Sequence, residues 1–240
     1  MRIEIVSVWY NEEAFAPFFL THYNYVDKIH IFLDADTTDN TVEMCKQYAN
    51  VEMNEIAFPE HMFDEGLVHK TINEFVPKIK SDWVYVLDPD EFIFPKNGES
   101  ARAVLERQTA NLLYAQMWQC WRHATEADLD PSNPSVYQRR YGTLYHKRRE
   151  RHYNKPIIVR PEIGLRWKLG QHKYHFKENI IVSDEKFVGS HWKFADIDVA
   201  IQKRMERCDR FPNQQDVDRE AMKIGMRKGA ENHKRCSQMF

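Results

Sequence analysis

Three carboxylates stand together at residues 88–91, where Asp88, Asp90 and Glu91 accompany a single proline. Such close negative charges repel one another unless a cation lies between them. Mg²⁺ or Mn²⁺ prefers oxygen ligands and commonly takes one or two carboxylates together with substrate phosphates. An isolated acidic group of this kind is more often a solvated turn or a helix cap, but the preceding apolar run favours a strand that ends at a ligand site. We therefore predict a divalent metal at Asp88 and Asp90, with Asp90 and Glu91 as candidate catalytic residues.

A second acidic group, formed by Asp34, Asp36 and Asp39, follows the apolar segment 28–33. Carboxylates at a strand end can accept hydrogen bonds from a nucleobase imide or from ribose hydroxyls. The same residues also suit an Asx turn that caps the next helix. Both interpretations hold together if Asp39 caps the helix while Asp34 and Asp36 face a ligand. A calcium loop is a weaker alternative, because the glycine and the distal glutamate of an EF-hand are missing.

Strands and helices are expected to alternate along the chain. Short β-branched and apolar runs predict strands at 3–8, 28–33, 51–53, 82–87 and 110–120. Apolar side chains at helical spacing predict helices at 12–25, 41–48, 66–79, 97–110, 196–210 and 217–228. This alternation predicts an α/β fold, Rossmann-like, with a mainly parallel sheet flanked by helices. Both acidic groups then fall at the carboxyl ends of strands, where ligands gather in such sheets.

The motifs around these groups resemble glycosyltransferase family 2, in the subgroup whose metal motif reads D-x-D-E-F. The resemblance covers about residues 3–95 and rests on three segments in the expected order, at 6–13, 33–41 and 87–92. It implies a GT-A-type fold and a nucleotide-sugar donor held by the following side chains: Tyr10, Asn11, Glu12, Asp34 and Asp36. It also implies that Asp88 and Asp90 hold the metal and the diphosphate.

The chain departs from the family pattern at two positions. Many members have a second aspartate where this chain has Ala35, and an alanine or another residue where it has Pro89. The resemblance therefore implies a UDP-sugar only as the default donor, with Mn²⁺ or Mg²⁺ as the cofactor.

The second half of the chain resembles the subgroup more loosely. The segment from Lys155 to Arg160, followed by His172, is similar to a K-P-I-x-R segment that leads to a histidine. Residues 190–194, which include His191 and Lys193, are similar to an H-Y-R-type segment. By this resemblance His172 or His191 completes the metal site, and Lys155, Arg160 and Lys193 bind phosphate. The alternative is that each histidine only packs beside aromatic side chains.

A transferase that inverts the sugar needs a carboxylate base to deprotonate the acceptor hydroxyl. No motif separates the four carboxylates of the central region that could serve: Glu126, Asp128, Glu162 and Asp184. Glu162 is the candidate that we place beside Asp90 and Glu91. A retaining enzyme needs no such base, so the stereochemistry stays open.

Charge is distributed unevenly along the chain. Residues 1–138 hold 23 acidic and 10 basic side chains, whereas residues 139–240 hold 13 acidic and 24 basic ones. We therefore predict a nucleotide-sugar-binding core at 1–138 and a basic acceptor-side subdomain at 139–240 that completes the same fold. The alternative is that the two halves simply neutralise each other.

The acceptor is predicted to be a hydroxyl of a glycan or of a lipopolysaccharide or capsule precursor. The basic and aromatic residues around 139–153 suit phosphates and stacked rings, so DNA is an alternative acceptor, as in phage enzymes that glycosylate hydroxymethylated bases. A solvated basic face is the plainer interpretation.

Two further function classes stay open. A nucleotidyltransferase also uses paired carboxylates, but the N-terminal segment 6–12 has no glycine for a phosphate loop. A non-catalytic nucleic-acid-binding protein would use only the basic half.

Other features of the sequence point to the cytoplasm. No run of about 18 apolar residues is present, and the N-terminus enters a strand pattern without a signal-peptide core. The cysteines are scattered without a C-x-x-C pair, which favours reduced thiols over a disulfide framework or a zinc site: Cys45, Cys120, Cys208 and Cys236.

Overall fold

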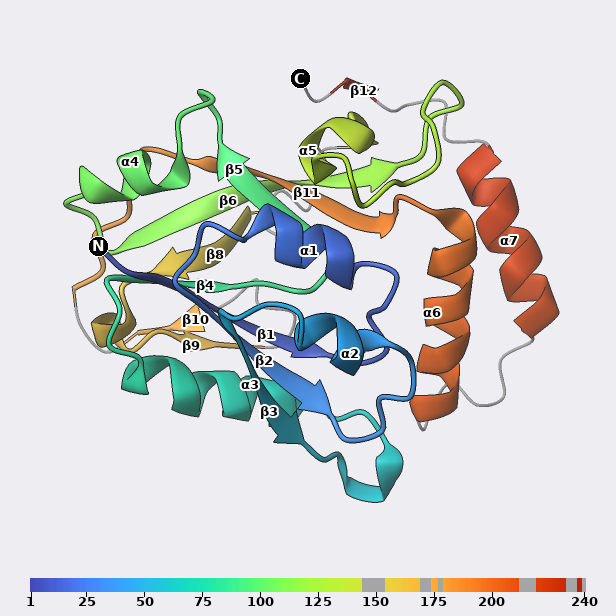
Figure 1. Cartoon of the computed structure of the whole chain (residues 1–240), viewed down its shortest axis with the longest axis horizontal. Helices are drawn as coiled ribbons and strands as arrows, with labels where there is room; N and C mark the ends of the chain where they lie inside the picture. Colours follow the sequence, from blue (N-terminus) through green and yellow to red (C-terminus); the bar gives the residue numbers. More distant parts are fainter. Residues whose placement is uncertain (144–153, 169–173, 177–178, 212–218, 232–236, 239–240) are drawn as a thin grey trace.

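The computed structural model describes residues 1–143, 154–168, 174–176, 179–211, 219–231 and 237–238. Most of the described strands form one mixed sheet, and a short two-stranded ribbon lies apart from it. Figure 1 shows helices packed around the sheet, with α6 (Ile197–Arg210) and α7 (Arg219–Glu231) beyond one of its ends. The α/β class predicted from the sequence is confirmed.

The N-terminal half of the sheet is parallel, with its strands in the order β4-β1-β2-β3. These strands are β1 (Ile3–Trp9), β2 (Lys28–Asp34), β3 (Val51–Ile56) and β4 (Trp83–Val86). Val8 lies opposite Phe32, and Val6 lies opposite Val86, so neighbouring strands end at the same edge of the sheet. The polar residues that follow each strand therefore meet at that edge.

The other half of the sheet is mostly antiparallel. Strand β8 (Asn154–Val159) lies between β4 and β6 (Leu112–Trp121) and runs antiparallel to both. Strand β11 (Phe187–Phe194) pairs parallel with β6 and antiparallel with β5 (Glu91–Pro95). The segment 139–240 thus contributes β8 and β11, together with shorter strands, to the same sheet as residues 1–138.

The short strands lie at the margins of the fold. Strand β7 (Tyr141–Thr143) pairs with β6, and β12 (Ser237–Gln238) extends that edge by pairing with β7. Strands β9 (Arg166–Trp167) and β10 (Tyr174–His175) form the separate ribbon.

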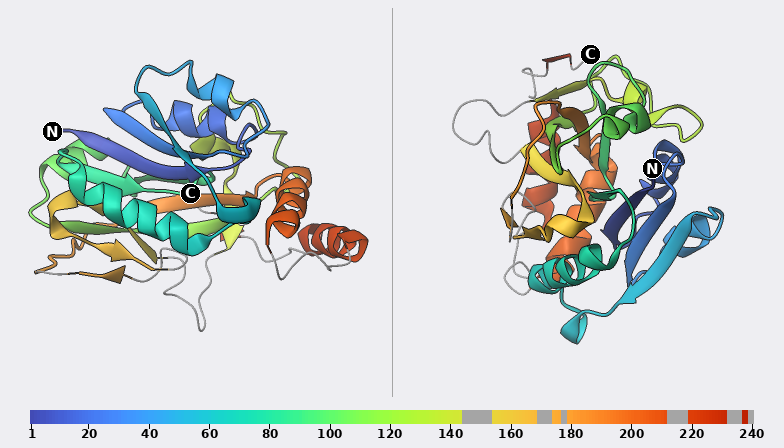
Figure 2. Two further views of the ribbon diagram at one scale, coloured as in Figure 1. Left: turned by 90° about the horizontal axis from the view of Figure 1, so that it is seen from below. Right: turned by 90° about the vertical axis from the view of Figure 1, so that its left-hand side faces the viewer.

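Helices cover the sheet on both faces (Figure 2). One face packs against α1 (Ala16–His22), α2 (Thr41–Cys45) and α4 (Ala101–Glu106), and the other against α3 (Glu65–Phe75) and the β9–β10 ribbon. Among the described residues, no helix combines the length and the apolar composition that a membrane crossing requires.

Two hydrophobic cores lie on opposite faces of the sheet, because successive side chains of a strand alternate between faces. Ile3 and Ile5 of β1 pack with the α1 face, whereas Val6 packs with the α3 face. In β4, Trp83 and Tyr85 likewise join the first core and Val84 joins the second. Both faces of these strands are buried, which explains why their sequences read as nearly continuous apolar runs.

Several helices are shorter than the sequence predicted. Helix α1 begins at Ala16 rather than Glu12, since the backbone amides of Phe15 and Ala16 both bond to the Glu12 carbonyl in a preceding turn. Helix α2 ends at Cys45. Its N-cap is Asn40, although Asp39 accepts a hydrogen bond from the Thr41 amide at 3.0 Å. The rest of each predicted segment forms turns or, after α3, the 3-10 turn Val76–Lys78.

Helix α6 (Ile197–Arg210) stands across the carboxyl ends of β1 and β2 (Figure 1), and α7 (Arg219–Glu231) packs beside it. Asp196 caps α6 by accepting hydrogen bonds from the amides of Asp198 and Val199 at 2.9 and 3.1 Å. Helix α5 (Ser135–Gln138) is a single turn near α1. The end of the sheet where the acidic groups meet is therefore closed on one side by α6.

Candidate functional site

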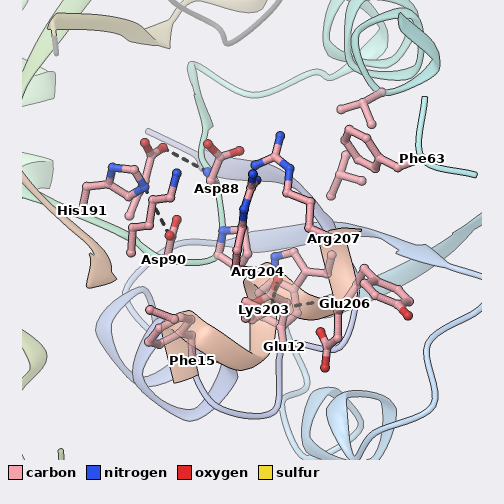
Figure 3. A pocket seen from close by; sticks show the side chains of 18 of the residues that line it. Glu12, Phe15, Phe63, Asp88, Asp90, His191, Lys203, Arg204, Glu206 and Arg207 are labelled. Carbon is pink, nitrogen blue, oxygen red and sulfur yellow. Dashed lines mark hydrogen bonds and ion pairs between the residues drawn. The ribbon is translucent and has the colours of Figure 1, made fainter. Parts of the chain in front are cut away.

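A cavity of about 820 Å³ lies at the carboxyl ends of the parallel strands, between the β4–β5 turn and α6. Figure 3 shows its order from one end to the other: Asp88, Asp90 and His191, then basic residues of α6, then Phe63. The cavity thus collects residues from segments that lie far apart in the sequence.

The predicted metal motif forms a tight turn between β4 and β5. The Glu91 amide donates to the Asp88 carbonyl at 3.1 Å, and the Asp88 amide donates to the Glu91 carboxylate at 3.1 Å. The Glu91 side chain is fully buried, whereas 45% of the Asp88 side chain is exposed. Glu91 therefore closes the turn from below and holds Asp88 and Asp90 toward the cavity.

Lys155 lies buried beneath this turn, because β8 pairs with β4. Its Nζ is 3.0 Å from Asp88 Oδ2 and also forms an ion pair with Glu91. Burial opposes the charge of this amine, but Asp88 and Glu91 outweigh it and raise the pKa of Lys155. Burial raises the pKa of Glu91, and the charge of Lys155 opposes that rise. Lys155 thus offsets part of the negative charge of the turn.

His191 reaches the turn from β11, whose register with β5 places His191 opposite Glu91. Its Nε2 is 3.2 Å from Asp90 Oδ2. Burial alone would raise the pKa of Asp90, but the charges of His191 and Lys155 outweigh it and lower the pKa to about 2. Burial likewise opposes the charged imidazole, and Asp90 reverses this and raises the pKa of His191.

The acidic turn fits a divalent ion that is bound only partly by protein. Two ligand atoms that each lie about 2.1 Å from one ion, at right angles to each other, are roughly 3 Å apart. The separation of Asp90 Oδ2 and His191 Nε2, 3.2 Å, is close to this value. Within the part of the chain that the structure describes, no three such side chains gather closely enough to enclose a metal ion. Mg²⁺-type sites commonly complete their shell with water and substrate phosphates. His172, the other predicted ligand, lies outside the described residues.

Three basic side chains form the middle of the cavity: Lys193, Arg204 and Arg207, which we call the cationic face. Arg204 and Arg207 are three positions apart on α6, so they point to the same side of the helix. Partial desolvation and the nearby charges of Arg207 and Arg204 lower the pKa of Lys193. Among the described residues, none of the three forms an ion pair. Their positive charge therefore faces the cavity.

Glu12 and Lys203 form an ion pair at the floor of the cavity, with a separation of 2.5 Å. Lys203 also donates to the Asn11 carbonyl at 2.8 Å. Burial raises the pKa of Glu12 to about 7, against the opposing charge of Lys203. This pair links α6 to the end of β1.

The second acidic group is closed by the last residue of α6. Arg210 Nη1 donates to Asp34 Oδ2 at 2.5 Å, and Asp34 Oδ1 accepts the Asp36 amide at 3.0 Å. Asp36 contacts His61 at 2.8 Å and Arg210 Nη2 at 3.5 Å. Asp34 is 2% exposed, and the Arg210 guanidinium lies 4.0 Å from the centre of the Tyr10 ring. Asp34 also lines the cavity, and Arg210 contacts both carboxylates, so the ligand role that the sequence predicted for Asp34 and Asp36 stays a prediction.

Other predicted site residues lie elsewhere or serve the backbone. Arg160 lies 4.4 Å over the Trp83 ring and donates to the carbonyls of Gln108 and Ala110. Glu162 lines a separate cavity of about 480 Å³ behind α3. The structure therefore does not bring these two side chains to the acidic turn, since each follows β8 at the end of the sheet remote from the turn.

Asn11 acts on the loop that follows β2. It has a positive φ of 49°, and its side chain accepts the amides of Thr38 and Asp39 at 2.8 and 3.4 Å. Glu126 similarly accepts the amides of His123 and Arg140, at 2.9 and 2.7 Å.

The basic residues of α6 were missed at the sequence level. Their spacing held the signal, since positions 203, 204, 207 and 210 fall on one side of the predicted helix 196–210. What the spacing does not show is that this side faces the acidic turn.

Comparison with known proteins gives neighbours among solved structures only. No protein-family model and no curated protein matches the chain. The solved structures include TarS 1-349 of S. aureus in complex with UDP-GlcNAc, at a TM-score of 0.47 and 14% identity, over 97% of this chain and 72% of that one. A longer TarS chain matches at a TM-score of 0.46 and 15% identity, and this chain spans 43% of it.

A second neighbour is glucosyl-3-phosphoglycerate synthase from Mycobacterium tuberculosis, in complex with Mn²⁺, UDP and phosphoglyceric acid. It matches at a TM-score of 0.34 and 13% identity, over 68% of this chain and 56% of that one. GT-A glycosyltransferases are thus among the proteins to which this chain is similar.

Proposed function

We propose that this protein is a glycosyltransferase that moves a sugar from a nucleoside-diphosphate donor to a hydroxyl acceptor. The observation that carries the proposal is the joint presence of the acidic turn and the cationic face in one cavity. Carboxylates alone would repel phosphates, and cations alone would need no acidic turn. A diphosphate that also binds a divalent ion accounts for both the acidic turn and the cationic face.

The acidic turn supplies the metal end of this site. Asp88, Asp90 and His191 would hold Mn²⁺ or Mg²⁺, which when bound stabilises the negative charge of a leaving diphosphate. Lys155 and Glu91 keep the turn in place from below, where both are buried. A turn that is already fixed loses little free energy to reorganisation during the reaction.

The cationic face supplies the rest of the charge for the diphosphate. Lys193, Arg204 and Arg207 would donate hydrogen bonds to phosphate oxygens, and arginine forks suit this geometry. Lys193 lies near enough to the turn that the charges of Asp90 and Asp88 oppose the lowering of its pKa by burial and by Arg207. The charge that develops on the leaving group thus meets fixed positive groups.

The acceptor is proposed as a hydroxyl of a glycan or of a surface-polysaccharide precursor, with DNA as the alternative. Of the basic stretch that suggested DNA, Arg139 is buried and donates to the carbonyls of Ala195, Ala127 and Gln138. Residues 144–153 lie outside the described residues.

A ligand panel tests the proposal. Thermal unfolding is followed with UDP, GDP and CDP and their hexose conjugates, with Mn²⁺, with Mg²⁺ and with excess EDTA. We expect at least one nucleoside diphosphate to raise the melting temperature in the presence of metal, because a ligand that binds only the folded state stabilises it. The matching sugar donor should then release nucleoside diphosphate slowly in water and faster with acceptor.

Two outcomes would contradict the proposal, and a third would contradict its metal. Pyrophosphate as the product would indicate a nucleotidyltransferase. Salt-dependent DNA binding without any turnover would indicate a nucleic-acid-binding protein. Full turnover in excess EDTA would remove the metal from the mechanism.

A further inference from the structure

The end of the cavity farthest from His191 is aromatic. Phe58, Phe63 and Phe211 meet there, with ring centres 5.4 Å apart for Phe58 and Phe63 and 5.0 Å apart for Phe63 and Phe211. We call these three residues the aromatic lobe, and all of them line the cavity. Phe63 and Phe211 are half-buried, so part of each ring is accessible from the cavity.

The aromatic lobe is continuous with the cationic face. The Arg207 guanidinium lies 4.7 Å from the centre of the Phe211 ring, and Figure 3 places Arg207 between Asp88 and Phe63. A ligand that extends along this cavity would meet carboxylates, then cations, then aromatic rings. A nucleoside diphosphate bound to a metal has the complementary order of groups.

Asp34 lines the same cavity and is the alternative partner for a base, but its carboxylate is already engaged. Asp34 is 2% exposed, and both of its oxygens accept hydrogen bonds from Arg210 and from the Asp36 amide. The guanidinium of Arg210 also lies between the rings of Tyr10 and Phe58, at 4.0 and 5.5 Å from their centres. A base at Asp34 would have to displace a buried ion pair.

A polar group beside the aromatic lobe has no partner. His69 on α3 lines the cavity and is 7% exposed. Its Nδ1 lies 2.6 Å from the carbonyl oxygen of Glu65, so Nδ1 carries the proton and Nε2 is left as an acceptor in the neutral ring. Among the described residues, Nε2 has no hydrogen-bond partner. A buried acceptor of this kind can receive a hydrogen bond from a ligand in the cavity.

We propose that the nucleobase of the donor stacks in the aromatic lobe and donates an N–H group to Nε2 of His69. This inference rests on the proposed function. Asp34 and Asp36 then act as positioning residues, which fix Arg210 and with it the adjacent Phe211. The chemistry of the site fits a base with a ring N–H, such as the imide of uracil.

A comparison of UDP with inorganic pyrophosphate, each with Mn²⁺, distinguishes the contribution of the base to the affinity from that of the phosphates. Isothermal calorimetry is used with wild type, Phe63→Leu, Phe211→Leu and the control Phe75→Leu, which lies at the other end of α3 against His30 and Phe32. We expect the affinity of the two lobe variants for UDP to be about tenfold lower than that of wild type, since stacking on aromatic rings contributes strongly to base binding. Their affinity for pyrophosphate should stay within about twofold of wild type.

N3-methyl-UDP tests the hydrogen bond. Wild type should bind UDP about tenfold more tightly than N3-methyl-UDP, and His69→Gln and His69→Phe should narrow that ratio. Melting temperatures of all variants show whether each one is folded before its affinity is interpreted.

The outcomes separate this inference from the proposed function. If wild type binds neither UDP nor pyrophosphate, the proposed function fails and the inference with it. If both bind but the lobe variants match Phe75→Leu, the inference alone is overturned. The inference alone is also overturned if Asp34→Asn lowers the affinity for UDP more than the lobe variants do. The melting temperature of Asp34→Asn shows whether this variant is folded.

Discussion

The two acidic groups at the ends of β2 and β4 have similar compositions and opposite surroundings. Asp34 and Asp36 are closed by Arg210, a guanidinium that is itself buried. Asp88 and Asp90 line the same cavity as Asp34, but their cationic partners, Lys155 and His191, come from β8 and β11 rather than from α6. The comparison teaches that distant segments, and not the Asp-x-Asp pattern itself, decide which cation such a pattern meets at a strand end.

The comparison predicts different consequences for mutation in the two groups. Substitutions in the β4–β5 turn should affect turnover, whereas substitutions around Asp34 should affect the free energy of unfolding.

Asp90→Asn should have the largest effect. Loss of this charge removes a proposed metal ligand, and we expect turnover with Mn²⁺ to fall about 100- to 1,000-fold. The melting temperature should stay within a few degrees of wild type. Release of nucleoside diphosphate from the donor measures the change.

Asp198→Asn is the matched control, because Asp198 is exposed, pairs with Arg227 and does not line the cavity. Unchanged turnover in Asp90→Asn would show that the open acidic turn is not the site of chemistry.

Arg210→Met should be the most destabilising change. It leaves Asp34 buried and Asp36 partly buried without their cation, which costs roughly 3–5 kcal/mol. For a chain of this size we expect a fall in melting temperature of roughly 10 °C. Thermal denaturation by circular dichroism measures it.

Arg227→Met provides the comparison, since its ion pair with Asp198 is exposed and should contribute at most about 1 kcal/mol. Equal shifts for the two variants would mean that Arg210 is not a buried clamp.

Asn11→Ala should destabilise the loop after β2 by about 2 kcal/mol. Alanine is unfavourable at the positive φ of this residue, and the acceptor for the Thr38 and Asp39 amides is lost. Chemical denaturation measures the change.

Asn11→Gly restores the backbone freedom but not the side-chain acceptor, so it should recover part of the loss. A large loss of donor affinity in Asn11→Gly, with little loss of stability, would favour the direct nucleotide contact that the sequence predicted.

His22 should account for an effect that appears only at acid pH. Burial lowers the pKa of His22 to about 4, against the opposing hydrogen bond to the Ile93 carbonyl. Its folded pKa is below the ordinary value, so the unfolded chain takes up the proton first. Stability that is fully present above about pH 6.5 should therefore decline as the pH falls toward 4.

His22→Gln removes this titration, so its stability should change less than that of wild type between pH 6.5 and 4. Identical pH profiles for the two proteins would assign all of the acid sensitivity to the carboxylates.

Much of the fold could be read from local pattern. The runs at 3–8, 28–33 and 82–87 lie within or overlap β1, β2 and β4, because β-branched and aromatic side chains fit strands that are buried on both faces. Helix α6 matches its predicted segment closely, since Asp196 supplies an N-cap at the start of an amphipathic run. The lengths of other helices were overestimated, because turns such as that at Glu12 are fixed by contacts with residues far along the chain, here Thr41.

The site was predictable only in part. Asp88, Asp90 and His191 do meet at one cavity, as the family resemblance implied, while their roles as ligands stay predictions. Arg160 and Glu162 follow β8 in the sequence, and nothing local reveals that β8 inserts between β4 and β6. That antiparallel insertion brings Lys155 beneath the acidic turn and carries Arg160 away to Trp83.

The sequence by itself determined which segments become strands and helices and which strand ends carry acids, because periodicity, propensity and capping act over a few residues. Only the tertiary structure decided which cation meets which acid. Arg210 and Asp34 are 176 positions apart, and Lys155 and Asp88 are 67 apart, so no local rule joins them. Each pairing follows from strand order and from the placement of α6, which are set by how the two apolar faces of the sheet are covered.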